Sequence, residues 1–340
     1  MWEFLRLLLA ACFYYSGLVR LAHSWTRRAG KRLIILNYHR ASGEHLRRQI
    51  LYLSRHYRLM HLNEALEELY AGEAAPRSRD RRIPLVLTFD DGYLDNYSYA
   101  WRLACELRIP MTIFLVPGYS ESGKYFWWLA TDYLIKHAKV EKVTIDSMIY
   151  YLAHSEYRRA LTVTIDSHLR YATSVEERET FLSAISHALG VSLPCRSMQG
   201  KTDESLPLNW AEIHEMARSG WISFAAHTMH HPLLRYLAHA SETWYEVAEC
   251  RRVLEQHTGR TIRSFAYPIG KVEHIGSEGI RAVKMAGYDW AVTTIEGVNT
   301  PQTDPYLLRR LPGDDEQHWL ILASELVGLL GVLSRYRKKR

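Results

Sequence analysis

Residues 85–93, LVLTFDDGY, decide the fold class of this chain. A short apolar run of strand length delivers two adjacent carboxylates, Asp90 and Asp91, at its carboxyl end, and Gly92 lets the backbone turn sharply away. Neighbouring carboxylates raise each other's pKa unless a positive charge lies beside them. A metal ion would supply that charge, with one carboxylate as a ligand and the other as a general base. The alternative is a strand that ends in an ordinary polar turn.

Similar apolar runs recur on both sides of this stretch. Runs that end in polar residues, or in Pro and Gly, predict further strands at 33–40, 111–116, 222–226, 264–268, 290–294 and 307–311. Helical periodicity lies between most of them, at 44–73, 98–107, 210–219, 241–259 and 277–286. Strands that alternate with helices predict a parallel sheet with the helices outside it. About seven strands favour a closed or partly opened α/β barrel, and no glycine-rich nucleotide motif is present.

The alternation of strands and helices is interrupted once. Residues 119–208 have the pattern of long amphipathic helices, which predicts a helical insertion. The barrel is therefore expected to consist of 33–118 and 209–312. Segments 1–32 and 313–340 flank it and differ from it in composition.

Basic residues gather at the two ends of the chain. The net charge is +6, but no basic and aromatic module lies between the ends, so nucleic acid is not an expected partner. The apolar run 7–19 is short of the ~20 residues that span a bilayer, and basic residues follow it. At the other end, the apolar run 319–333 precedes a basic tail.

These end segments predict two amphipathic helices that lie on a membrane surface. The alternative is that each packs on the barrel as an ordinary helix. Basic residues after the first apolar run place the chain on the cytoplasmic face of the inner membrane. The four cysteines are widely spaced and form no disulfide framework, which agrees with a reducing compartment.

Two histidines follow the predicted strand at 222–226. His227 and His231 bracket a short segment in which Pro232 disfavours a regular helix, so both imidazoles can turn back towards one point. With one Asp they make a set of three ligands that suits a catalytic Zn²⁺ or another divalent metal. His230 is a rival ligand in the same segment.

These motifs resemble those of the NodB-homology polysaccharide deacetylases, the family four carbohydrate esterases. TFDDG at 88–92 and HTMHH at 227–231 are similar to the first two motifs of the family, FAYPIG at 265–270 to the third and GYDWA at 287–291 to the fourth. NYHR at 37–40 resembles the opening strand of the exopolysaccharide-type branch. The resemblance covers the predicted barrel segments, and it implies a distorted (β/α) barrel of about seven strands.

The resemblance also implies roles for single residues. Carried over by position, Asp90 is the catalytic base and His39 the acid that protonates the leaving amine. The metal ligands are Asp91, His227 and His231. The backbone N–H of Ile269 is the expected donor to the oxyanion, and Tyr93 and Trp290 are candidates for the substrate pocket.

The sequence departs from the family pattern at two places. Ala266 stands where the third motif usually has an Arg, and the His of the fifth motif is missing, because His318 lies in the wrong context. Arg40, Arg309 or Arg310 could replace the missing Arg.

Together these features predict a metal-dependent N-deacetylase that acts on an N-acetylated amino sugar of a membrane-associated polysaccharide or a lipid-linked glycan precursor. Zn²⁺ is the expected metal, with Co²⁺ or Ni²⁺ as alternatives. The expected partners are the glycan and the membrane surface. Alternative functions are removal of a formyl or other N-acyl group, or carbohydrate binding or assembly by a catalytically dead protein.

Overall fold

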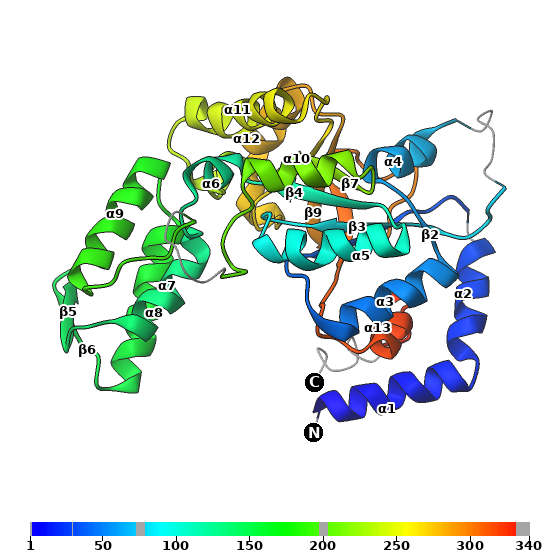
Figure 1. Cartoon of the computed structure of the whole chain (residues 1–340), viewed down its shortest axis with the longest axis horizontal. Helices are drawn as coiled ribbons and strands as arrows, with labels where there is room; N and C mark the ends of the chain where they lie inside the picture. The colour runs from blue at the N-terminus through cyan, green and yellow to red at the C-terminus, as the bar shows by residue number, and fades with distance from the viewer. Residues whose placement is uncertain (1, 29, 73–78, 197–202, 331–340) are drawn as a thin grey trace.

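A closed barrel of parallel strands forms the centre of the molecule (Figure 1). The computed structural model describes residues 2–28, 30–72, 79–196 and 203–330. Within these residues, seven strands follow one another around the barrel: β1 (Ile34–Tyr38), β10 (Leu308–Pro312), β9 (Trp290–Glu296), β8 (Ser264–Ala266), β7 (Ile222–Ala226), β4 (Met111–Leu115) and β3 (Pro84–Phe89). Pairing of β1 with both β10 and β3 closes the ring, and the short β2 (Arg58–Leu59) extends the edge of β3. The predicted barrel is confirmed.

The barrel is distorted on one side. Strand β8 has three residues and meets β7 at a single pair, Ala226 and Phe265. The register between β9 and β10 shifts between Leu308 and Arg310. Regular pairing is denser on the opposite side, where β1 and β3 stay in register over five consecutive residues.

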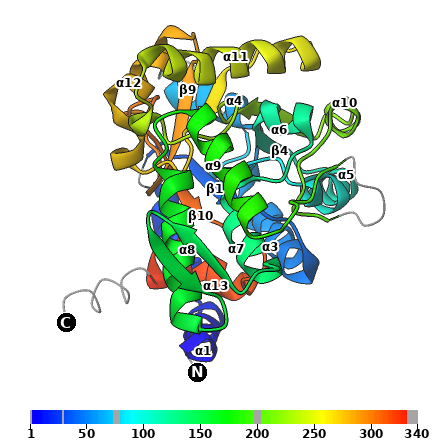
Figure 2. The same cartoon turned by 90° about the vertical axis from the view of Figure 1, so that its left-hand side faces the viewer.

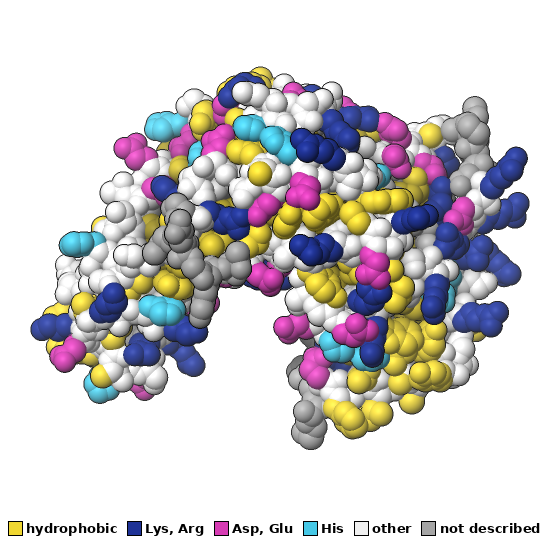
Figure 3. All heavy atoms as spheres, in the orientation of Figure 1, with side chains coloured by type: hydrophobic (Ala, Val, Ile, Leu, Met, Phe, Trp, Pro, Cys, Tyr) yellow, Lys and Arg dark blue, Asp and Glu magenta, His cyan; other side chains and the backbone are white. Residues whose placement is uncertain are grey.

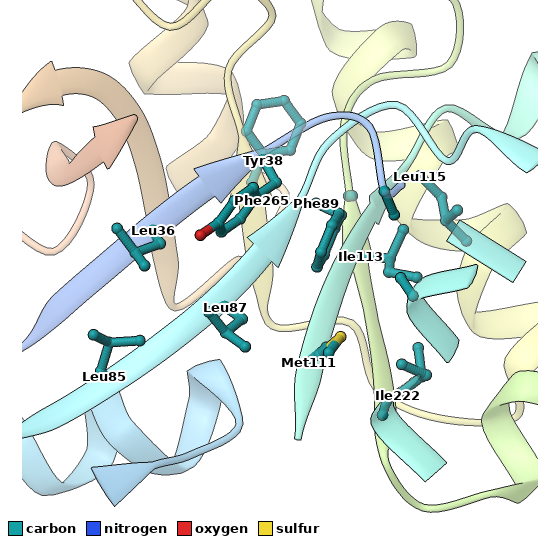
Figure 4. Close-up of a cluster of buried hydrophobic side chains, with 14 of the residues drawn as sticks. Leu36, Tyr38, Leu85, Leu87, Phe89, Met111, Ile113, Leu115, Ile222 and Phe265 are labelled. Atoms are coloured by element: carbon teal, nitrogen blue, oxygen red, sulfur yellow. The ribbon is translucent and has the colours of Figure 1, made fainter. Parts of the chain in front are cut away.

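Alternate residues of each strand face opposite ways, as the pleat requires. One set fills the barrel interior together with α4 (Leu62–Tyr70), and it includes Leu33, Ile35, Val86, Phe114, Ala225, Ala266, Val292 and Leu308. The other set packs against the outer helices, and Figure 4 shows part of it around Leu36, Leu87, Phe89 and Ile113. These outer helices are α3 (Gly43–His56), α5 (Arg102–Leu107), α10 (Trp210–Arg218), α11 (Ala240–Thr258) and α12 (Val272–Met285). A π-helical turn, Asn96–Trp101, precedes α5 where the sequence predicts one continuous helix.

The segment between β4 and α10 stands beside the barrel as a separate arm (Figures 1 and 2). It contains α6 (Pro117–Ser122), α7 (Trp127–His137), β5 (Lys142–Ile145), β6 (Met148–Tyr151), α8 (Ser155–Arg170) and α9 (Val175–Ala188), with an apolar cluster of its own. The hairpin β5–β6 is absent from the sequence prediction. Its turn residues, Asp146 and Ser147, both have positive φ, a conformation that Asn-Gly or Asp-Gly usually signals.

The two ends of the described chain pack together. Helix α13 (Trp319–Leu326) lies against α1 (Trp2–Tyr15) and α3, and Arg6 pairs with Glu325 at 2.7 Å. The apolar side chains of α13 are therefore buried by protein, except for the partly buried Trp319, and residues 331–340 lie outside the described part. Helix α2 (Leu18–Arg28) follows α1 at a bend of 70°. Of the described helices, none alone is long and apolar enough to cross a bilayer. The bent pair α1–α2 together has the required length and composition.

Candidate active site

The predicted site residues gather at the carboxyl ends of the barrel strands. Asp90 and Asp91 follow β3, His227 follows β7, and His39 follows β1. This end of the barrel faces the arm formed by α6 to α9, as Figure 2 shows from the side of the arm. The space-filling view in Figure 3 shows a deep hollow between the arm and the barrel.

Asp91, His227 and His231 lie together, as the sequence predicts. One ligand atom of each lies within 4.8 Å of the other two, and all three side chains are buried. Asp91 Oδ1 is 3.4 Å from His227 Nε2 and 3.6 Å from His231 Nε2. Bonds of about 2.1 Å to a tetrahedral Zn²⁺ would separate two ligand atoms by about 3.4 Å.

Asp91 Oδ1 is also an orphaned polar atom. It is buried, and no hydrogen-bond partner for it exists among the described residues. A buried oxygen without a hydrogen-bond partner costs free energy. A bound positive group next to Asp91 Oδ1 would remove that cost. The donor set, its spacing and this oxygen all fit a divalent cation.

The tautomer of His227 is set by its backbone neighbour. Its Nδ1 lies 2.7 Å from the carbonyl oxygen of Ala266, which can only accept a hydrogen bond. A proton therefore sits on Nδ1, and Nε2 faces Asp91. Metal-binding histidines are commonly oriented in this way.

Left-handed backbone is concentrated around these residues. Asp91, Thr228, His231 and Ile269 have φ between 58° and 73°, which non-glycine residues rarely adopt. The Thr228 hydroxyl donates to the His227 carbonyl and accepts the His231 N–H, which holds the turn. Gly118 packs so closely under the turn that a Cβ there would lie 2.5 Å from the Met229 carbonyl oxygen.

His230, the rival ligand, points elsewhere. Its Nδ1 lies 2.7 Å from Oε1 of Glu246 on α11, its N–H donates to the other carboxylate oxygen, and its ring stacks on Tyr245. The structure therefore leaves His227 and His231 as the paired histidines.

His231 is enclosed by the arm. The ring of Trp128 lies 4.3 Å from the His231 ring, and Trp127 Nε1 donates to the His231 carbonyl. Burial lowers the pKa of His231 to about 3, and the neighbouring His227 acts in the same direction. The imidazole of His231 is therefore neutral at physiological pH, as a metal ligand must be.

Asp90 lies inside the barrel on a guanidinium fork. Arg310 of β10 donates from Nη1 and Nη2 to the two Asp90 oxygens, each at 2.8 Å, and both side chains are almost fully buried. Arg310 Nε donates to the Thr293 carbonyl, and Nη1 also reaches the Thr88 hydroxyl at 3.3 Å. Arg310 is thus fixed by three groups inside the barrel: Asp90, Thr293 and Thr88.

The other two candidate arginines lie elsewhere. Arg40 pairs with Asp95 and lies over the Tyr93 ring, and Arg309 is exposed. Of the three arginines, Arg310 is therefore the one that contacts Asp90.

Both carboxyl groups are ionised. Burial alone would raise the pKa of Asp90, but Arg310 and His227 outweigh it, and the pKa is lowered. The pKa of Asp91 is lowered as well, since His227 and His231 more than offset its burial. In turn, the two carboxylates raise the pKa of His227 against the effect of its burial.

His39 lies at the rim of this group. Its side chain is exposed, its carbonyl accepts from Asn96, and its charge helps to lower the pKa of both Asp90 and Asp91.

Ile269 and Tyr93 are also at this end of the barrel. Ile269 follows β8, and its N–H donates to no acceptor in the described part of the chain. The Tyr93 hydroxyl accepts from Trp128 Nε1 at 2.7 Å, while burial and the charge of Asp91 raise the pKa of Tyr93 well above its usual value. Tyr93 therefore stays protonated.

Trp290 is not part of this site, contrary to the sequence prediction. It is the first residue of β9 and pairs with Ser264, the first residue of β8, so it lies at the amino end of the barrel. Its ring stacks on Tyr70 of α4 at 5.4 Å. The predicted strand 290–294 already implied this position, because a residue that opens a strand cannot lie at its carboxyl end.

The sequence prediction did not include Trp128 in the site. The aromatic run at 125–128 was visible in the sequence, but nothing local indicates that an insertion helix folds back over a histidine about a hundred residues away.

Comparisons with known proteins agree with this geometry. The family model described as polysaccharide deacetylase matches residues 77–290. No curated protein matches the sequence. IcaB from Ammonifex degensii is 18% identical, with a TM-score of 0.54 over 87% of this chain and 97% of that one. The deacetylase PplD of Streptococcus pyogenes, in complex with acetate, is 15% identical, with a TM-score of 0.53 over 86% and 96%.

A third solved structure is similar to the same extent. The deacetylase domain of BpsB from Bordetella bronchiseptica is 15% identical, with a TM-score of 0.50 over 83% of this chain and 96% of that one. At these identities the solved structures support the fold, and the family match covers more than half of the chain. The chain therefore belongs to the polysaccharide deacetylase family and is an amide-bond hydrolase.

Proposed function

We propose that this protein is a metal-dependent N-deacetylase that acts on an N-acetylated amino sugar in a membrane-associated polysaccharide or a lipid-linked glycan precursor. One observation carries the chemistry: the buried cluster of Asp91, His227 and His231 lies beside a second, ionised carboxylate on Asp90. Hydrolysis of an amide by activated water requires a group that binds the metal and a group that accepts a proton from water, and two neighbouring carboxylates can supply both.

Asp91, His227 and His231 would hold the metal, for which Zn²⁺ is the first candidate and Co²⁺ or Ni²⁺ are alternatives. A divalent cation at such a site polarises the acyl carbonyl and lowers the pKa of water. The hydrogen bond from His227 to Ala266 keeps the imidazole in the orientation that this ligation needs.

Asp90 would act as the general base. Arg310 binds both of its oxygens, so the carboxylate is ionised and fixed in orientation before substrate arrives. It accepts the proton that water loses as the water oxygen bonds to the acyl carbon. Positioning by Arg310 therefore substitutes for the arginine that Ala266 replaces.

Two further groups would complete the reaction. The free N–H of Ile269 can donate to the oxygen that becomes negative when water adds to the carbonyl. His39 can protonate the amine as the carbon–nitrogen bond breaks, since its side chain is exposed to solvent and close to both carboxylates. The products are the free amino sugar and a carboxylate.

The membrane part of the proposal rests on α1 and α2. Exposed apolar side chains run along both helices, with Phe4, Leu8 and Tyr15 on α1 and Leu21 and Trp25 on α2. Basic residues at the end of α2 flank this stripe, and an apolar stripe beside basic residues is typical of helices that lie on an anionic membrane. By the same charge rule, the cytoplasmic face of the inner membrane is the proposed location.

Release of acetate from purified full-length protein tests the chemistry. Lipid-linked N-acetylated sugars and soluble chito-oligosaccharides are compared as substrates, and formate is measured alongside acetate to identify the acyl group. We expect Asp90→Asn to keep its metal but to lose activity by about 10²–10⁴-fold, the usual contribution of a general base. Full activity in this variant would remove Asp90 from the reaction.

A further inference from the structure

A second polar cavity lies at the other end of the barrel from the active site. Its volume is about 110 Å³, and it opens between α2, α4 and the amino ends of β1 and β3. Leu33 and Pro84, which precede or begin these strands, form part of its wall. None of the catalytic candidates lines it.

The wall of this cavity is strongly basic. Five cationic side chains from two stretches of the chain, 27–32 and 81–82, converge on it: Arg27, Lys31, Arg32, Arg81 and Arg82. Figure 3 shows Lys and Arg side chains gathered along this edge of the molecule, beside α2. Glu68 is the one carboxylate of the wall, and Arg58 pairs with it from outside.

Two arginines of the wall have no carboxylate partner in the described part of the chain. Arg82 pairs with Asp80, and the Lys31 ammonium donates to the Ala71 carbonyl. Arg27 and Arg81, in contrast, pair with no carboxylate in the described residues, and both are exposed. Two unpaired guanidinium groups at one cavity suit an anion with several oxygens, and a phosphoryl group is the common one.

The surface next to the cavity indicates where that phosphoryl group comes from. Leu21 and Trp25 are 67% and 78% exposed, and they precede Arg27 on the same helix. A Trp and a Leu at one helical face, followed by arginines, match the order of acyl region and headgroup region at a membrane surface.

We propose that this cavity binds the phosphoryl headgroup of an anionic lipid. The inference rests on the membrane contact proposed above and is independent of the hydrolase chemistry, since the cavity and the catalytic residues lie at opposite ends of the strands. With such a site, α2 would recognise the headgroup of the lipid. An amphipathic helix without the site would respond only to the charge of the membrane surface.

Matched pairs of variants test the proposal. Arg27→Gln with Arg81→Gln removes the two cavity arginines that lack a carboxylate partner among the described residues. Arg28→Gln with Arg79→Gln removes the same charge from neighbours that do not line the cavity. Binding of the full-length chain is measured by flotation with vesicles of phosphatidylcholine, with and without phosphatidylglycerol. We expect the cavity pair to weaken binding to anionic vesicles roughly tenfold more than the control pair.

Several results would overturn the headgroup site. Equal losses for the two pairs would mean that binding follows surface charge alone. Equal binding of the wild type to neutral and anionic vesicles would leave the membrane contact standing without a headgroup site, and no binding to either would end both.

A titration with inorganic phosphate separates the sources of the ligand. One outcome is that phosphate binds the wild type and not the Arg27→Gln, Arg81→Gln variant, while the wild type shows no preference for anionic vesicles. That result would mean that the ligand of the cavity is a soluble anion and not a lipid. Acetate release from a soluble substrate should be the same in both pairs of variants. Loss of the headgroup site can therefore be told apart from failure of the proposed deacetylase activity.

Discussion

Replacing Arg310 by Met removes the guanidinium that holds Asp90 and keeps a side chain of similar length. In the wild type, Arg310 makes two hydrogen bonds of 2.8 Å to Asp90 and one of 2.8 Å to the Thr293 carbonyl, all inside the barrel. Removing one partner of a buried ion pair costs about 3–5 kcal/mol, because the other charge is left without compensation. We therefore expect a loss of this size in the free energy of unfolding at pH 7, measured by urea denaturation.

The loss should depend on pH in a defined direction. In the wild type, the pKa of Asp90 is lower in the folded than in the unfolded protein, so its contribution to stability is complete above the unfolded pKa of about 3.9 and is lost at lower pH. In the variant, burial becomes the main influence and raises the folded pKa. Stability of the variant then increases as the pH falls through that raised pKa, and the gap to the wild type narrows between pH 7 and about pH 4.

Arg309→Met is the matched control, since Arg309 is the exposed neighbour on the same strand. It should change the unfolding free energy by less than about 0.5 kcal/mol. The acid limb of the pH profile of kcat/KM should move to higher pH in Arg310→Met and stay in place in Arg309→Met. A double-mutant cycle with Asp90→Asn should show that the two losses are far from additive. Additive losses, or an unmoved acid limb, would refute the view that Arg310 sets the ionisation of Asp90.

The remaining predictions concern the metal, the acid and the arm. His231→Gln should lose bound metal in elemental analysis, while His230→Gln, which alters the outward-facing neighbour, should retain it. His39→Gln should keep its metal and lower kcat about 10²–10⁴-fold, and unchanged turnover would place the acid elsewhere. Trp128→Ala should relieve the burial of His231 and raise its pKa from about 3, so that protons displace the metal at a higher pH in a metal titration.

The barrel and the meeting of the three candidate metal ligands could be predicted because both depend on local pattern. A change from apolar to polar residues in the sequence marks the carboxyl end of each strand. Because the strands are parallel, their carboxyl ends all lie at the same end of the barrel. Asp91, His227 and His231 therefore meet although 136 positions separate Asp91 from His227. His230 could be set aside only with the structure, because the left-handed turn at Thr228 and His231 decides which ring faces inwards.

The choice among the arginines needed the three-dimensional register. Leucine occurs in both alternating sets of LLRRL at 307–311, so the period of two does not say whether Arg309 or Arg310 faces inwards. The register shift between β9 and β10 falls at this very place. Docking of Trp128 on His231 is likewise a long-range contact that no sequence periodicity encodes.

The arrangement of costly features argues against a protein that only binds carbohydrate. Four non-glycine residues around the site hold left-handed backbone, and strained conformations of this kind cost about 1–3 kcal/mol each. Two carboxylates and a guanidinium are buried beside them, and no residue that the structure describes donates a hydrogen bond to Asp91 Oδ1. A surface that binds sugars needs none of these, since stacking rings and exposed polar groups suffice. The proposed reaction, in which Asp90 acts as the base beside a cation held by Asp91, His227 and His231, accounts for the presence of all these costly features at one end of the barrel.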